Sequence, residues 1–311
     1  MIKGGVMIFL KTELGHEKLV SWDDITKRPN FIPKISKDGH VLSHIIGHYQ
    51  FQDKIHCGLT GCNQPHNKGY IVVTEKGLET NIGNTCGRTI FGVEFDDHAS
   101  DFDRFKENEQ RKSDIASAKS KTTQWHHALE AMRNGSKDIS WITNKLDGII
   151  NANHVGRSGA MEMRSLSRTQ NSNVTVDMRI IDKKMKELQF TFNKHYRESG
   201  EALEQKHVGK INHLHVLQPA NNLRIMYHSV REGIKQVDEC NINTAPSPML
   251  SSIAQRANSL DSEIKHLQQI FLDARNFLSR KNLQVILRKL EDMDDVDEIE
   301  RQAFRNFIYS L

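Results

Sequence analysis

Proline is scarce in this chain, with six prolines among 311 residues, and aromatic residues contribute only 7%. Proline interrupts helices, so its scarcity favours long helices over a loop-rich β fold. No stretch approaches the twenty apolar residues that a membrane-spanning helix needs, and the mean hydropathy is −0.59. These absences predict a soluble, bacterial-type cytoplasmic protein with no membrane partner.

Cysteine is also rare, and its four copies are unevenly placed. Three lie between residues 57 and 86, whereas Cys240 stands alone. A secreted disulfide framework would carry more cysteines. Cysteines clustered with histidines at short spacing in an intracellular chain indicate a metal site instead.

The clustered residues match the ligand set of a structural zinc site. Cys57 and Cys62 flank a short segment with two glycines, and glycine allows the tight turn that brings two thiolates onto one ion. His66 follows four residues later, and Cys86 follows after another twenty. Together they predict a closed, tetrahedral Cys3His site for Zn2+. His56 is the substitute if His66 is not a ligand, and a site of three thiolates alone would strengthen the case for a catalytic zinc, which four ligands argue against.

The residues between the ligands predict a β-hairpin. Residues 70–74 are apolar and largely β-branched, residues 75–77 form a turn, and residues 78–82 return as a second strand. A ligand-bearing loop followed by a hairpin is the layout of zinc ribbons and treble clefs. We therefore predict an α+β fold, with a small zinc-bound module at residues 1–100 followed by mostly helical segments.

The motif resembles one found in uncharacterised bacterial and prophage-type proteins. It reads CGLxxCxxxHxxGY from Cys57 to Tyr70, then ETNIG from Glu79 to Gly83, then Cys86-Gly87. The resemblance is strongest over roughly the first hundred residues. It implies a compact module and an association with phage or mobile elements, and it implies no activity.

Beyond residue 100, apolar residues recur at alternating steps of three and four, which is typical of coiled coils and helical bundles. Four runs show this spacing, at residues 115–132, 174–192, 223–237 and 257–278. We expect a coiled-coil or bundle region at 101–244 and a C-terminal helical segment at 249–311. The linker between them is Ala245-Pro246-Ser247-Pro248, because each proline disfavours helix at the preceding residue.

Two local patterns leave alternatives open. Residues 174–180 and 208–217 also alternate between apolar and polar, so a short β ribbon is an alternative to helix there. Residues 41–49 favour a short helix carrying His44 and His48 four positions apart. We interpret these two histidines as ordinary surface or half-buried residues, because the glutamate of a zinc-protease motif is missing between them.

The positive charge is concentrated in the middle of the chain, where residues 101–240 carry 23 basic and 18 acidic residues within a net charge of +4. Lysine and arginine that follow a phosphate backbone are the basis of nucleic-acid binding, although charged runs on helices are more often solvated faces. The candidate contacts are Lys68, Lys76, Arg88, Arg179, Lys183 and Lys186.

We therefore predict a zinc-stabilised binding or adaptor protein rather than an enzyme. Its partner would be DNA, RNA or another protein, and its helices would mediate assembly. One alternative is a metal-dependent nuclease or other hydrolase that uses the His213-Leu214-His215 pair. Another is a purely structural coiled-coil oligomer.

Overall fold

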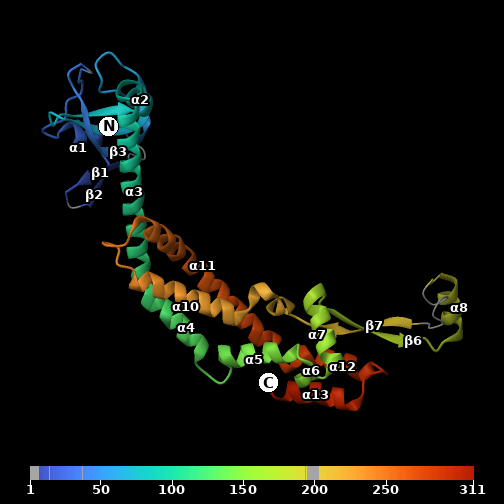
Figure 1. Ribbon diagram of the computed structural model, residues 1–311. Coiled ribbons are helices and arrows are strands. Elements are labelled where there is room, and N and C mark those ends of the chain that lie inside the picture. The colour runs from blue at the N-terminus through green and yellow to red at the C-terminus, as the bar shows by residue number, and fades with distance from the viewer. Residues whose placement is uncertain (1–6, 14, 37, 193, 195–202) are drawn as a thin grey trace. The chain divides into compact units, whose positions relative to one another are not determined.

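The computed structural model describes residues 7–13, 15–36, 38–192, 194 and 203–311, which form two compact units (Figure 1). Unit 1 consists of Met1–Ser117 and a later segment, Asn241–Ala254. Unit 2 consists of Ala118–Cys240 and Gln255–Leu311. The later segment is tied into unit 1 by the hydroxyl of Ser247, which donates a hydrogen bond to Asn108 Oδ1 at 2.8 Å.

Unit 1 is built on a five-stranded antiparallel sheet in the order β2-β1-β3-β4-β5. The strands are β1 (Met7–Thr12), β2 (Gly15–Leu19), β3 (Leu42–His56), β4 (Pro65–Thr74) and β5 (Glu79–Gly83). The predicted hairpin at 70–82 is confirmed as β4 and β5. The helix expected at 41–49 is wrong, because these residues belong to β3 and pair with β4, for example Ile45 with Val72.

Both faces of this sheet are buried, because alternate residues of each strand point to opposite sides. On one face, Tyr70 and Val72 pack against Phe95 and Phe102 of α3 (Val93–Lys119), which follows α2 (Asn84–Phe91). On the other face, Tyr49 and Ile71 pack with residues around α1 (Trp22–Thr26). Ser21 caps the start of α1, since its hydroxyl accepts a hydrogen bond from the backbone N–H of Asp23.

Unit 2 is mostly helical and carries one two-stranded ribbon. Its helices are α4 (Thr122–Arg133), α5 (Ile139–Ile149), α6 (Ala152–Val155), α7 (Arg157–Thr169), α8 (Lys183–Phe192), α10 (Leu223–Glu239), most of α11 (Ser247–Phe277), α12 (Arg280–Asp292) and α13 (Glu298–Tyr309). Two 3-10 turns, η1 (Leu214–Leu217) and η2 (Pro219–Asn221), precede α10. The ribbon pairs β6 (Asn173–Arg179) with β7 (Leu203–Lys210).

Three of the four apolar runs form buried helix faces, as predicted. The clearest lies mainly on α11, where Ala257, Leu260, Ile264, Leu267, Phe271, Ala274 and Leu278 are all buried. The run at 174–192 is the exception. Its first part is strand β6, so the alternative of a β ribbon is correct there, and Ile181 and Phe192 are 91% and 82% exposed.

No helix within the described residues is both long enough and apolar enough to cross a bilayer.

His48 is a buried ionisable group in the core of unit 1. It is 8% exposed, its Nε2 atom has no hydrogen-bond partner among the described residues, and its ring lies edge-on to Tyr70. Burial lowers the pKa of His48 to about 4; the charges of Lys106 and Lys68 add to this effect and that of Asp103 opposes it. The folded protein therefore holds this imidazole neutral at pH values where an unfolded histidine is protonated.

We predict that His48 makes unit 1 sensitive to acid. Stability contributed by the neutral ring is complete above pH 6.5, the ordinary histidine pKa, and is lost as the pH falls toward 4, since only the unfolded chain then gains the proton. The loss is up to about 3 kcal/mol. Urea denaturation at stepped pH should show a shallower acid loss for His48→Gln than for wild type. His228→Gln, at an exposed site, should follow wild type, and parallel curves for all three would contradict the prediction.

Candidate metal centre and arginine-lined pocket

Three cysteines meet at one edge of the sheet in unit 1. Cys57 directly follows β3, Cys62 lies shortly before β4, and Cys86 lies in the first turn of α2, directly after β5. Because β3, β4 and β5 are antiparallel neighbours, the end of β3, the start of β4 and the end of β5 lie at the same edge. Strand pairing therefore brings together thiols that are up to 29 residues apart in the sequence.

The three sulfur atoms are close enough to share one metal ion. They lie within 4.8 Å of one another, and the Sγ atoms of Cys62 and Cys86 are 2.9 Å apart. Two thiolates on a tetrahedral zinc lie about 3.8 Å apart, so binding requires this pair to separate by about 1 Å. Cys57 is fully buried, whereas Cys62 and Cys86 are partly exposed, which gives an ion access from solvent.

The thiols alter one another's acidity. Burial raises the pKa of Cys57, and burial together with the hydrogen bond to Cys62 raises the pKa of Cys86 to about 12. Burial acts in the same direction on Cys62, but its hydrogen bonds with Cys86 and the backbone of Gln64 outweigh it and lower the pKa. Cys62 is therefore the most acidic of the three thiols, and metal binding would displace the protons that the cluster holds.

Gly58 fixes the loop that carries the first two thiols. Its backbone N–H donates to the carbonyl of Asn81 at 2.7 Å, and its own carbonyl accepts from the N–H of Ile35. A Cβ atom at this position would lie 2.0 Å from the Thr80 hydroxyl and 2.8 Å from the Asn81 carbonyl oxygen. Only glycine therefore allows the segment after Cys57 to approach β5 this closely.

His66 is not part of the sulfur cluster. It lies on β4 opposite Ile55, its Nε2 atom is 2.5 Å from the Tyr49 hydroxyl, and its Nδ1 atom is 3.2 Å from the Gln64 carbonyl oxygen. Its ring also packs on Gly83. His56, the substitute ligand, directs Nδ1 at the Asn63 carbonyl oxygen. Within the described residues, no histidine or carboxylate joins the three thiols.

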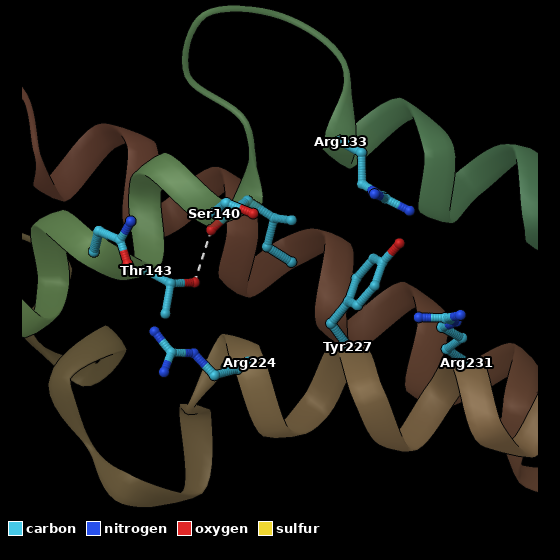
Figure 2. Close-up of a pocket in the computed structure, with 8 residues that line it drawn as sticks. Arg133, Ser140, Thr143, Arg224, Tyr227 and Arg231 are labelled. Carbon is cyan, nitrogen blue, oxygen red and sulfur yellow. Dashed lines mark hydrogen bonds between the residues drawn. The ribbon is translucent and has the colours of Figure 1, made fainter.

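A second candidate site is an arginine-lined pocket in unit 2, with a volume of about 330 Å3. Arg224, Tyr227 and Arg231 line it from one face of α10, because residues three and seven apart share a helix face. Figure 2 shows Arg133 reaching from α4 toward Tyr227, with Arg231 beside it, and Arg224 directed toward Thr143 of α5. Guanidinium and hydroxyl donors of this kind suit phosphate oxygens.

Carboxylates neutralise this pocket only in part. Arg224 is 3.3 Å from Asp147, but both side chains are more than 60% exposed, so the pair is weak. Among the described residues, Arg133 and Arg231 form no ion pair. Sequence reasoning missed this pocket because its arginines come from separate helices, and only the i, i+3, i+7 spacing on α10 hinted at it.

The six basic residues predicted from sequence divide between the two units, with three in each. Lys68 lies on β4, Lys76 lies in the turn before β5, and Arg88 of α2 is paired with Asp96 at 3.0 Å. Arg179 ends strand β6, whereas Lys183 and Lys186 lie on α8, so these three residues come from two different elements.

The predicted His213 and His215 pair lies in unit 2 beside Asp273 of α11.

No protein-family model matches this chain, and it has no match among curated proteins or among solved structures.

We predict that Gly58→Ala destabilises unit 1 by about 3 kcal/mol, because the added methyl group collides with the backbone of Asn81. Gly61→Ala is the matched control: Gly61 has a φ of +82° but open space around it, so its cost is about 1 kcal/mol. Hydrogen exchange of the β3–β5 amides measures both free energies. Equal protection in the two variants would show that the close approach at Gly58 is unimportant.

Proposed function

We propose that this protein is a zinc-stabilised adaptor that binds nucleic acid. In this proposal Cys57, Cys62 and Cys86 hold a Zn2+ ion that stabilises unit 1 and has its fourth coordination position open, and the arginine-lined pocket of unit 2 binds backbone phosphate. The observation that supports nucleic-acid binding best is the pocket itself, where three guanidinium groups converge with few compensating carboxylates.

The donor set of unit 1 suits zinc. Thiolates are the soft ligands that zinc prefers, and three of them converge from three segments of the chain as free cysteines. The ion would link the ends of β3 and β5 to the start of β4. Its contribution would be stability, since a small module with a limited core gains folding free energy from a bound metal.

We expect wild-type protein to bind one zinc through thiolates and Cys86→Ser to lose it. At a zinc concentration about 1,000 times Kd, the loss would cost unit 1 about 4 kcal/mol of stability. Metal analysis and thermal unfolding measure both effects. Cys240→Ser, which removes the buried cysteine outside the cluster, is the control and should retain zinc. Equal zinc content in the two variants, or a Cys62–Cys86 disulfide in wild type, would refute the zinc assignment.

The pocket of unit 2 supports phosphate as the ligand chemistry. Arginine presents planar donors that match phosphate oxygens in pairs, and a phosphate would compensate for the charge of Arg133 and Arg231. Arg224 and Arg231 are seven residues apart, or about 10 Å along a helix, so each would contact a different phosphate of one strand. The hydroxyl of Tyr227 between them offers a further donor. Contacts of this kind give affinity without sequence preference.

We predict that Arg133→Ala and Arg231→Ala each weaken nucleic-acid binding about 10-fold at low salt, the usual cost of one charge-assisted hydrogen bond. Each should also reduce the slope of log affinity against log salt by about one. Gel shifts with single-stranded and duplex DNA and RNA test this. Arg168→Ala removes an exposed arginine elsewhere in unit 2 and should change binding little. Absence of any shift at low salt would refute nucleic-acid binding and leave the zinc assignment intact.

A further inference from the structure

His213, His215 and Asp273 form a second cluster of metal-ligating side chains, in unit 2. Nδ1 of His213 is 3.1 Å from one carboxylate oxygen of Asp273, and Nε2 of His215 is 3.1 Å from the other. One ligand atom from each residue lies within 4.8 Å of the other two. Two ligands of a tetrahedral zinc lie about 3.4 Å apart, so these separations already approach those of a metal site.

Buried neighbouring residues and an unusual backbone conformation position the two histidines. Leu214 and Val216 are buried, whereas His213 and His215 are partly exposed and both reach the carboxylate of Asp273. His213 has φ and ψ of 60° and 32°, a left-handed conformation that residues with side chains rarely adopt. Such a conformation persists only where its surroundings enforce it, and it is common at functional sites.

Two asparagines fix the loop around the histidines. Asn282 accepts a hydrogen bond from the backbone N–H of Asn212 at 2.8 Å and donates to its carbonyl at 3.1 Å. The side chain of Asn221 donates to the carbonyl of His215 at 2.9 Å. The loop is therefore positioned before any ligand arrives, which reduces the entropy cost of binding.

Asp273 supplies the charge that a cation would neutralise. It is 9% exposed, and the polar partners of its carboxylate among the described residues are the two histidines and Gln269, whose Nε2 donates to Oδ1 at 3.1 Å. No lysine or arginine within the described residues pairs with it. A buried carboxylate is costly without a cationic partner, and a metal ion bound between Asp273 and the two imidazoles would be such a partner. Gln269 orients the carboxylate as outer partners of metal ligands do.

The geometry points to a binding site for one divalent transition-metal ion, Zn2+ in the first instance, at His213, His215 and Asp273. Two imidazoles and one carboxylate suit zinc and neighbouring transition metals, whereas calcium and magnesium prefer oxygen ligands alone. Three protein ligands leave a coordination position open, unlike a closed structural site. His213 also lines a cleft of about 470 Å3, which gives the ion a route from solvent.

Metal binding to the full-length protein tests this site, with zinc content measured after dialysis against buffered Zn2+. His213→Ala and Asp273→Asn should each hold one zinc fewer than wild type. His228→Ala, an exposed histidine on α10, should match wild type. Gln269→Leu should retain the site with affinity about 10- to 100-fold lower. Wild-type zinc content in both ligand variants would overturn the inference.

Cobalt substitution distinguishes this site from the cysteine cluster. Co2+ on thiolates gives an intense sulfur-to-metal charge-transfer band, which Cys86→Ser should remove. Co2+ on His213, His215 and Asp273 gives only weak d–d bands, which should survive in Cys86→Ser and disappear in Asp273→Asn. Failure of the cysteine site would thus leave the weak bands intact.

A measurement on wild-type protein avoids dependence on the folding of variants. Zn2+ should protect His213 and His215 from acylation by diethyl pyrocarbonate, whereas exposed His228 should react equally with and without zinc. Equal modification of His213 and His215 in the two conditions would overturn the inference.

Discussion

The antiparallel pairing of β3, β4 and β5 is the constraint on which the chemistry of unit 1 depends. It places the end of one strand beside the start of the next, so three short segments carrying thiols meet without any direct covalent link. The hydrogen bond from the Gly58 N–H to the Asn81 carbonyl also holds the loop between Cys57 and Cys62 against β5. Buried residues on both faces of the sheet hold these strands in register.

Local signals in the sequence predicted much of this fold. The apolar, β-branched residues of β4, the glycine turn before β5 and the serine cap of α1 act within a few residues, so each is legible without tertiary knowledge. The same holds for the buried face of α11, whose spacing is purely helical. Residues 174–180 satisfied both a helical and an alternating pattern, and their pairing with β7 decided in favour of strand.

The sites were harder to predict because their partners come from distant parts of the chain. His66 has the spacing of a zinc ligand, yet its Nε2 atom is hydrogen-bonded to the hydroxyl of Tyr49, seventeen residues earlier on β3. The pair His213 and His215 was visible as a motif, whereas Asp273 lies 58 residues later than His215 on helix α11, whose apolar spacing gave no sign of a site. The arginine-lined pocket was missed for the same reason, because Arg133 lies on α4 whereas Arg224 and Arg231 lie on α10.

The later segment of unit 1 has a consequence for how the protein is made. Residues 241–254 belong to unit 1, yet they follow a stretch of 123 residues, Ala118–Cys240, that belongs to unit 2. During synthesis the ribosome therefore releases the sheet and its thiols long before the segment that carries Ser247. Unit 1 therefore starts to emerge first but is complete only after the first part of unit 2 has followed it, and unit 2 in turn needs residues 255–311, which emerge later still.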